Sequence, residues 1–282
     1  MSAHQQIDIQ QLPTKDAHAM LLGMVAPRPI AFVSSIDKKG KPNLSPFSFF
    51  NIFSSNPPIL IFSPSRRVRD NTEKDTLRNV LSVGEVVINL VDESLLERMT
   101  LTSFEFPSTT NEFDAAGLTP VPSTHVQPPL VAEAKVAMEC KVNEVISLGK
   151  QGGAGNLVIC EVMWIHVQPD LLDNNGRFLE DAFHPIARMG GETYLASSAR
   201  FDMNKLNRTV LGVHGLPKHI QQSPVLTGEQ LAKLGKLERY PLTEAFDKLH
   251  ISTPATTLAQ HQLAAKLIEQ NQIEAAMALL CR

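Results

Sequence analysis

The stretch RPIAFVSSIDKKGKPNLSPFSFFN, which runs from Arg28 to Asn51, carries the strongest fold signal in the first part of the chain. Residues Ile30 to Ile36 are mostly apolar or β-branched, and a polar DKKGKP turn separates them from a returning segment. This pattern predicts a β-hairpin. The returning segment is unusual because hydroxyl groups, a proline and aromatic rings share one strand: Ser45, Pro46, Phe47, Ser48, Phe49 and Phe50.

Further β-patterned segments, separated by turns, come after this hairpin. The segment from Lys135 alternates polar and apolar residues, as a strand with one solvated face does. The GKQGGAGN segment at Gly149–Asn156 is typical of a hairpin turn. Closely spaced strands with few long helices predict a small, closed or nearly closed antiparallel β-barrel. We expect strands at Ile30–Ile36, Leu44–Phe53, Ile59–Ser63, Glu85–Val91, Lys135–Ile146 and Leu157–Val167.

The remaining segments are predicted to be helices and loops. Two short helices are expected between strands, at about Asp75–Val83 and Glu93–Leu101. The segment Thr102–Gln127 is polar, rich in Pro and Ser, and long for a connection, so we expect it to act as a lid. The chain is expected to divide into a domain at 1–204 and a helical extension at 205–282. The expected helices of the extension are Thr227–Leu237, Leu242–Leu249 and Pro254–Leu280, the last broken near Asn271.

Charge and composition argue against several classes of protein. The net charge is −3, and the basic cluster at residues 66–69 is too short to follow a nucleic-acid duplex. The first residues lack the basic start and apolar core of a secretory signal, and no apolar run approaches the ~18 residues of a membrane span. The three cysteines and nine histidines show no metal-site spacing. We therefore expect a cytoplasmic protein without nucleic-acid, membrane or metal binding.

A basic, hydroxyl-rich loop, SPSRRVRDNTEKDT at residues 63–76, comes after the third predicted strand. A helix is expected to begin near Asp75, and the unpaired N–H groups at a helix start favour a phosphate. Arg66 or Arg67 would add charge-assisted hydrogen bonds, and Lys74 a point charge. The alternative is that Asp75 or Thr72 caps the helix and the arginines are solvated.

The strand of serines and phenylalanines also has two interpretations. Aromatic rings on one face of a strand are usually core residues. Hydroxyl groups beside an apolar wall would also suit a flat heteroaromatic ligand, and a ligand with a planar head and a phosphate tail would use both segments. The later RMGGETY segment, Arg188–Tyr194, has paired glycines that allow either a plain turn or a close approach to a ligand.

Taken together, five segments resemble, in their order and spacing, the flavin reductase-like, FMN-binding split-barrel family: PRPIAFVSSIDKKGKPNLSPFSFFN, PPILIFS, EKDTLRN, GEVVINLV and RMGGETY. The resemblance spans roughly residues 25–194. It implies a six-stranded antiparallel split β-barrel with short helices that binds FMN, usually at the interface of a homodimer. The helical extension lies outside the shared pattern.

The resemblance also implies which residues bind the cofactor. Two strands would border the isoalloxazine ring, through Ser34, Ser35, Asn43, Ser45, Phe47, Ser48 and Asn51. The loop and helix start would hold the phosphate, through Ser63, Arg66, Lys74 and Thr76. Tyr194, from the RMGGETY segment, completes this predicted site.

The function predicted from this resemblance is that of an FMN-binding oxidoreductase, an NAD(P)H-dependent flavin reductase. NADH or NADPH would reduce the flavin, and the protein would bind and tune it without a catalytic acid, base or nucleophile. A loosely held FMN would serve a partner oxygenase. Two alternatives stay open: an FMN-binding electron carrier or redox sensor without NAD(P)H turnover, and a barrel enzyme whose substrate is chosen by the Thr102–Gln127 lid.

Overall fold

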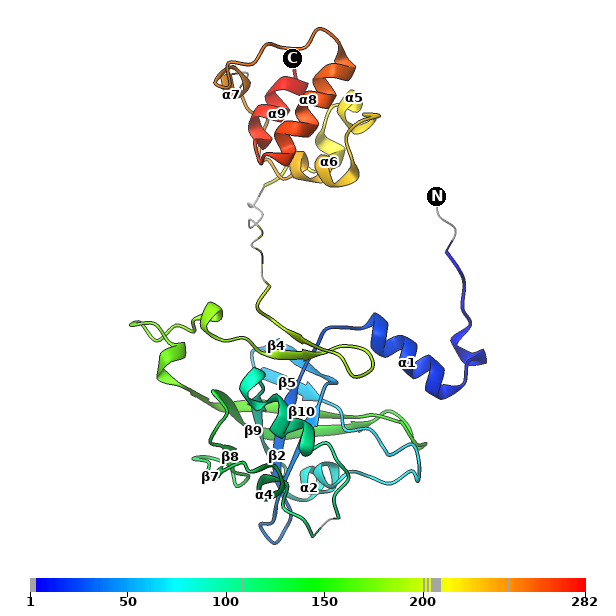
Figure 1. The fold of residues 1–282 in the computed structure, drawn as a ribbon, viewed down its shortest axis with the longest axis vertical. Coiled ribbons are helices and arrows are strands. Elements are labelled where there is room, and N and C mark those ends of the chain that lie inside the picture. The colour runs from blue at the N-terminus through cyan, green and yellow to red at the C-terminus, as the bar shows by residue number, and fades with distance from the viewer. Residues whose placement is uncertain (1–3, 108, 200, 202, 204–208, 243) are drawn as a thin grey trace. The chain divides into compact units, whose positions relative to one another are not determined.

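The computed structural model describes residues 4–107, 109–199, 201, 203, 209–242 and 244–282. The chain forms two compact units, residues 1–200 and residues 201–282. The first unit contains the strands, and the second is helical (Figure 1). The predicted boundary near residue 205, residue 108 of the predicted lid and residue 243 of a predicted helix lie outside the described residues.

A seven-stranded antiparallel sheet is the centre of the first unit. The order of strands across the sheet is β3-β2-β6-β9-β10-β5-β4. In chain order, the seven strands of the sheet are β2 Ala31–Ile36, β3 Pro42–Phe47, β4 Phe50–Ser55, β5 Pro58–Phe62, β6 Glu85–Leu90, β9 Val136–Ser147 and β10 Asn156–Val167. The fold is therefore mainly β, with one large antiparallel sheet, as the strand pattern predicts.

The strand count differs from the predicted six, because the segment expected as one strand at Leu44–Phe53 forms two. Strand β3 pairs with β2 at one edge of the sheet, and β4 pairs with β5 at the other edge. Pro46 lies on the edge strand β3, where a residue without an N–H group is tolerated. Among the described residues, no ladder joins β3 to β4, so the sheet is not closed by hydrogen bonds.

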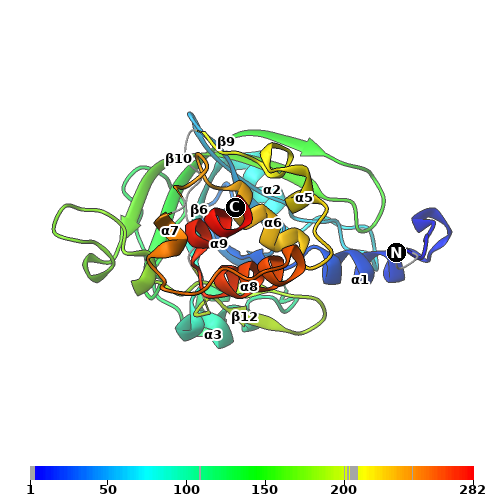
Figure 2. The ribbon, with the colours of Figure 1, turned by 90° about the horizontal axis from the view of Figure 1, so that it is seen from above.

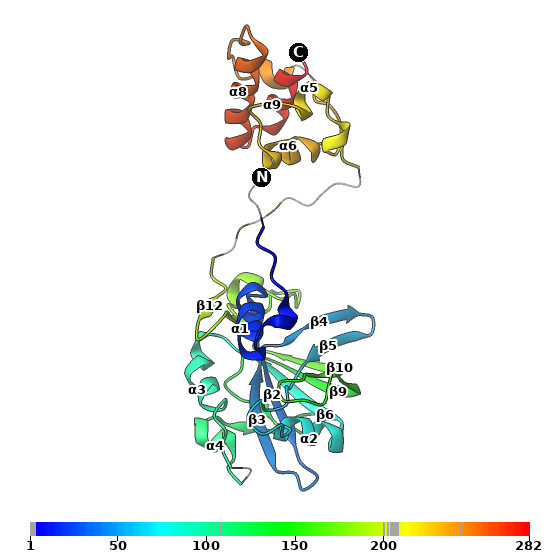
Figure 3. The same ribbon diagram turned by 90° about the vertical axis from the view of Figure 1, so that its right-hand side faces the viewer.

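The chain itself holds the two edges of the sheet near each other. Only Ser48 and Phe49 separate β3 from β4, and two residues span less than about 11 Å. The sheet must therefore curl, and its strands fan out from this point, with β2 and β3 pointing away from β4 and β5 (Figure 3). The sheet of the described residues is thus curled and partly open.

Both faces of the sheet are buried near β2, whose six residues are all buried. On one face, Ala31 and Val33 pack in a core with side chains from β5, β6, β9 and β10 and with Val80 of helix α2. On the other face, Ile30 and Phe32 pack with residues of helices α3 (Leu96–Leu101) and α4 (Glu112–Ala116). Helix α2 is Asp75–Val83, as predicted, and ends at Gly84 in the left-handed conformation (φ 76°).

Short elements surround the sheet of the first unit. The predicted helix at Glu93–Leu101 is a 3-10 turn followed by one α-helical turn and a half. The helical elements are η1 Ile9–Gln11, α1 Thr14–Met24, η2 Glu93–Leu95, α3 Leu96–Leu101, α4 Glu112–Ala116, η3 Pro169–Leu171 and η4 Glu180–Ala182. The short strands are β1 Arg28–Pro29, β7 Pro120–Val121, β8 Leu130–Val131, β11 Ile186–Arg188 and β12 Tyr194–Ala196.

The second unit is a small bundle of helices with its own core. Helices α8 and α9 lie side by side (Figure 1 and Figure 2). The predicted break near Asn271 is confirmed, since Asn271 has a positive φ of 61° between them. Thr227 and Gln230 form a capping box at the start of α6. The elements are η5 Val213–Gly215, α5 Lys218–Gln221, α6 Gly228–Gly235, α7 Glu244–Asp247, α8 Thr257–Glu269 and α9 Ile273–Leu280.

Across the described residues, every helix is too short or too polar to span a bilayer.

Candidate functional site

A groove lies between β3 and the start of α2, beneath the first residues of the predicted lid. Its volume is about 70 Å³, well below the ~300–1,000 Å³ of pockets that enclose a whole drug-sized ligand. The groove can therefore enclose a small charged group, with the remainder of a ligand outside it. The residues lining it are Asn43, Leu44, Ser45, Arg67, Lys74, Asp75, Thr76, Thr102, Ser103, Phe104, Glu105, Phe106 and Glu112.

The start of α2 brings two predicted phosphate ligands into this groove. Lys74 is the N-cap residue, with extended backbone and no capping side-chain hydrogen bond, so the first N–H groups of the helix have no side-chain cap. The Thr76 hydroxyl is buried and accepts a hydrogen bond from the Asn43 amide, with Oγ1 and Nδ2 2.9 Å apart. This bond ties the helix start to β3 and fixes the groove between them.

Lys74 is a half-buried cation that lines the groove. Its Nζ lies 5.2 Å from the centre of the Phe47 ring, within the range of a cation–π interaction. Burial lowers the pKa of the Lys74 ammonium, and the positive charge of Arg67 lowers it further, whereas the carboxylate of Glu105 opposes both. An anionic ligand in the groove would stabilise the charged form of Lys74.

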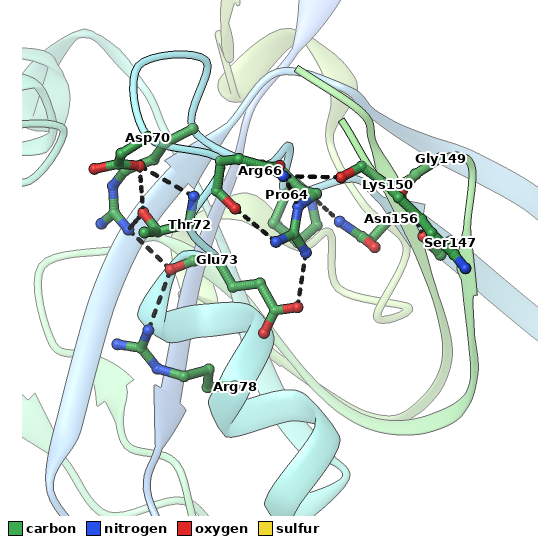
Figure 4. A network of polar contacts seen from close by, with 12 residues as sticks. Pro64, Arg66, Asp70, Thr72, Glu73, Arg78, Ser147, Gly149, Lys150 and Asn156 are labelled. Atoms are coloured by element: carbon green, nitrogen blue, oxygen red, sulfur yellow. Dashed lines mark hydrogen bonds and ion pairs between the residues drawn. The ribbon is translucent and has the colours of Figure 1, made fainter. Parts of the chain in front are cut away.

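The consecutive arginines Arg66 and Arg67 point to different sides of the basic loop. Arg67 lines the groove; its Nε is 3.1 Å from a carboxylate oxygen of Glu105, and its NH1 donates to the Glu73 carbonyl oxygen at 2.8 Å. Arg66 forms an ion pair with the Glu73 carboxylate at 2.8 Å and donates to Asn71 Oδ1 at 2.7 Å. Figure 4 shows Arg66 between Glu73 and the strand ends that carry Ser147 and Asn156.

The turn between β9 and β10 holds the basic loop in place. Arg66 N donates to the Ala154 carbonyl oxygen at 2.8 Å, Gly153 N donates to the Arg66 carbonyl oxygen at 3.0 Å, and Asn156 Nδ2 donates to the Pro64 carbonyl oxygen at 3.0 Å. A Cβ atom on Gly152 would lie 3.0 Å from the carbonyl oxygens of Arg67 and Val68. The glycine-rich turn predicted at Gly149–Asn156 is confirmed, and its glycines permit this close packing.

The structure brings four of the predicted site residues together in the groove: Asn43, Ser45, Lys74 and Thr76. Phe47 borders them through its contact with Lys74. Ser63 lies on the other side of the basic loop, where a Cβ on Gly155 would meet its hydroxyl at 2.7 Å. The polar contacts of Arg66 are on that side too.

The two predicted serines of β2 lie on opposite faces of the strand. Ser35 Oγ accepts a hydrogen bond from Asn79 Nδ2 of α2 at 3.1 Å, on the groove side of the sheet. Ser34 shares the other face with Ile30 and Phe32, and its buried hydroxyl has no hydrogen-bond partner among the described residues. Ser35 thus supports the helix that forms the groove, and Ser34 faces away from it.

The remaining predicted residues lie beyond the groove. Ser48 is in the link between β3 and β4, and Asn51 is exposed on β4, where its Oδ1 accepts from Ile52 N at 2.8 Å. Tyr194 is on β12, with the Arg188 guanidinium 4.3 Å from its ring centre. No described contact joins Tyr194 to the groove.

Only the first part of the predicted lid lies over the groove. Its far end is attached to the sheet by Glu139, a fully buried carboxylate that accepts hydrogen bonds from the backbone N–H groups of Thr124, His125 and Val126. His166 Nε2 is 2.6 Å from the same carboxylate. Burial alone would raise the pKa of Glu139, but these hydrogen bonds together hold it below its ordinary value.

Two carboxylates of the lid segment were not predicted as part of the site. Glu105 reaches Arg67 and Arg69, with distances of 3.1 Å and 2.9 Å. Glu112 accepts a hydrogen bond from Leu44 N of β3 at 3.3 Å, and burial raises the pKa of its carboxyl group. Neither position has a local sequence signal, because Glu105 lies on an irregular loop and the position of Glu112, at the start of α4, depends on tertiary packing.

Comparison with known proteins places this fold in a family. Residues 24–186 match the family model described as the flavin reductase like domain. Nitrilotriacetate monooxygenase component B from Bacillus cereus has a similar structure, with a TM-score of 0.68 and 34% identity, over 72% of this chain and 100% of that chain. For 2-nitrobenzoate 2-nitroreductase from Pseudomonas fluorescens, the TM-score is 0.65 and the identity 30%, over 71% and 96% of the two chains.

A third structure supports the architecture alone. It is a protein from Shewanella frigidimarina named for its split barrel domain, with a TM-score of 0.60 and 23% identity, and the match covers 70% of this chain and 96% of that chain. The family match ends at Ile186, before the helical unit begins. Because the match covers more than half of the chain and confirms the resemblance seen in the sequence, the protein belongs to the flavin reductase-like domain family.

Proposed function

We propose that the protein is an NAD(P)H-dependent flavin reductase that binds FMN, with the phosphate in the groove at the start of α2. The observation that supports this proposal most is the meeting of Lys74, Thr76 and Arg67 beside β3, within a fold of the flavin reductase-like family. An ammonium group, a guanidinium group and a helix N-terminus together favour a doubly charged phosphate. Arg67 takes the role that was predicted for Arg66.

The flavin ring would extend from the groove along β3 toward β4. A strand rises about 3.3 Å per residue, so the chain extends over roughly 17 Å from Asn43 to Ser48. The ligand would lie along this length. Ser45, Ser48 and Asn51 would supply hydrogen bonds at the edge of the ring. Phe47 packs against Phe62, with ring centres 5.4 Å apart, and would form part of the apolar wall below it.

The chain's own residues would bind and orient the flavin rather than react. FMN supplies the redox chemistry, since it accepts a hydride from a nicotinamide and passes electrons on. Hydrogen-bond donors near the ring would favour its reduced, anionic form. No residue of the groove is assigned as a catalytic acid, base or nucleophile.

A homodimer would complete the open side of this site. Strand β4 carries Asn51 next to Ile52 and Phe53, whose side chains are 64% and 63% exposed. Trp164 on β10 is 51% exposed. Large apolar side chains at the surface of a sheet commonly mark an interface, and a partner seated here would enclose the ring beyond the phosphate groove.

The name of one structural neighbour suggests the step after flavin reduction. Nitrilotriacetate monooxygenase component B is one part of an oxygenase system. By analogy, the reduced flavin would pass to a partner oxygenase, and the domain at 1–204 would perform the reduction.

The test is to purify the full chain, load it with FMN and add NADH or NADPH without oxygen. Bleaching of the visible flavin band by either nicotinamide is the expected result. Bound FMN that neither nicotinamide bleaches would favour the electron carrier or redox sensor over the reductase. Light scattering on the same sample should give twice the chain mass of 31.0 kDa, and the monomer mass would contradict the dimer.

A further inference from the structure

Glu105 places a carboxylate against the cations that would bind a ligand phosphate. One carboxylate oxygen is 3.1 Å from Arg67 Nε, and the other is 2.9 Å from Arg69 NH2. Both Arg67 and Glu105 line the groove that Lys74 and Thr76 share. The side chain thus puts a negative charge where the proposed function requires the negative charge of the ligand.

Buried residues anchor the chain on both sides of Glu105. Thr102 is buried, and its hydroxyl donates to the Met99 carbonyl oxygen at 2.8 Å. Phe113 is fully buried on the other side. Between these anchors, Glu105 stands between Phe104 and Phe106, whose ring centres are 5.0 Å apart, and half of its side chain is exposed. The carboxylate can therefore leave Arg67 without disturbing the core.

A carboxylate and a phosphate cannot share Arg67 without repelling each other. Two like charges about 4 Å apart repel each other, and more strongly where water screens them less, so a ligand phosphate at Arg67 would favour the departure of Glu105. The ion pair that it breaks is partly exposed, with side-chain exposures of 20% for Arg67 and 50% for Glu105, and such pairs are weak. The exchange is therefore easily reversed.

We infer that Glu105 competes with the phosphate of the ligand for Arg67, and that this competition keeps FMN exchangeable. The inference rests on the proposed flavin site and concerns how tightly that site holds its ligand. A reductase that delivers reduced flavin to another protein must release it. An internal carboxylate that takes over the arginine as the phosphate leaves would favour that release.

The experiment compares Glu105→Gln with a matched control, Glu73→Gln, in the full chain. Both changes remove one carboxylate from an arginine of the basic loop, but Glu73 pairs with Arg66 outside the groove lining. Dissociation constants for FMN and riboflavin are measured by quenching of flavin fluorescence. We expect Glu105→Gln to tighten FMN by about three- to tenfold relative to Glu73→Gln, and riboflavin by less than about twofold.

Equal or weaker FMN binding by Glu105→Gln, relative to Glu73→Gln, would overturn the inference, because Glu105 would then support Arg67 rather than compete with a ligand. Failure of the proposed function looks different, since wild type and both variants would take up no FMN. In that case inorganic pyrophosphate decides the question. A larger rise in melting temperature with pyrophosphate for Glu105→Gln than for Glu73→Gln supports the competition, and equal rises overturn it.

Discussion

The two sides of one basic loop, represented by Arg66 and Arg67, have different roles although the residues are consecutive. Arg67 faces the groove, beside Lys74 and the start of α2. Arg66 faces the β9–β10 turn and is held by Asn71 and Glu73. One side of the loop places positive charge in the groove, where the proposed phosphate would bind, and the other side uses guanidinium hydrogen bonds to fix the shape of the loop.

The role of each charge in this loop is set by its packing neighbours. The β9–β10 turn occupies one side of the loop so closely that glycine is needed at Gly152 and Gly155. A guanidinium on that side donates to protein oxygens and has a structural role. The Arg67 guanidinium, on the opposite side, donates to the lid carboxylate of Glu105 and to oxygens of Thr72 and Glu73, and it also lines the groove.

The strongest effect should be on FMN affinity when Arg67 is replaced. Arg67→Ala should weaken FMN binding by about ten- to hundredfold, since a hydrogen bond to a charged group contributes roughly 1.5–3 kcal/mol. Riboflavin, which lacks the phosphate, should lose far less. Arg66→Ala is the matched control: it should lower the melting temperature of the protein and change the FMN dissociation constant by less than about threefold. Equal losses of FMN affinity in Arg67→Ala and Arg66→Ala would show that the two sides of the basic loop do not differ in their role in FMN binding.

A smaller effect is expected when the turn side is disturbed by a methyl group. In Gly152→Ala the new Cβ would lie 3.0 Å from two carbonyl oxygens of the basic loop, so the backbone must shift. We expect the free energy of unfolding to fall by about 1–3 kcal/mol, measured by urea denaturation, with a modest loss of FMN affinity.

Gly23→Ala is the control for this change. Apart from its chain neighbours and its own helix backbone, no described atom lies within 4 Å of the Cβ that it would add in helix α1. The free energy of unfolding of Gly23→Ala should equal that of wild type or be slightly higher. If Gly152→Ala unfolds like Gly23→Ala, the β9–β10 turn does not hold the loop.

The weakest of these effects concerns pH on the groove side. Burial and the charge of Arg67 lower the pKa of Lys74 from its ordinary value of 10.5, so its ammonium group loses its proton at a lower pH than that of an exposed lysine. A neutral Lys74 attracts a phosphate less, so FMN affinity should fall as pH rises toward and through that lowered pKa. We expect the ratio of FMN to riboflavin affinity to fall by about two- to threefold as the pH rises from neutral toward 10.5, the ordinary pKa of lysine.

Two controls show whether Lys74 causes the expected fall in the affinity ratio. Any titration of the flavin ring is common to FMN and riboflavin and cancels in the ratio. Lys74→Arg keeps its charge throughout this range, so its ratio should stay constant. A ratio that falls equally in wild type and Lys74→Arg would show that another group titrates.

The sequence allows most of the elements of the fold to be predicted, because their local patterns are strong. Helix α2 has the predicted bounds, and the alternating strand and its glycine-rich turn are present as β9 and the β9–β10 connection. The expected strand at Leu44–Phe53 was wrong as one element, because β3 and β4 continue with similar residues while pairing at opposite edges of the sheet. The local sequence of a strand does not encode which other strand pairs with it in the sheet.

The candidate groove was predictable to the extent that its lining residues lie on regular elements. Asn43, Ser45, Lys74 and Thr76 meet in the groove because a strand and a helix start have fixed geometry. The choice between Arg66 and Arg67 depends on a turn more than 80 residues later in the chain. Glu105 reaches the groove by the path of an irregular loop, for which no residue period exists.

The order of the strands has a consequence for how the protein is made. Strands β3, β2 and β6 lie on one side of the sheet, and strands β5 and β4 lie on the other side. Strands β9 and β10 lie between these two groups and join them. A nascent chain that ends before Val136 therefore has two separate sets of strands with exposed pairing edges. Because such edges attract other chains, the first 135 residues should aggregate when truncated, and folding during synthesis must wait until Val167 has left the ribosome.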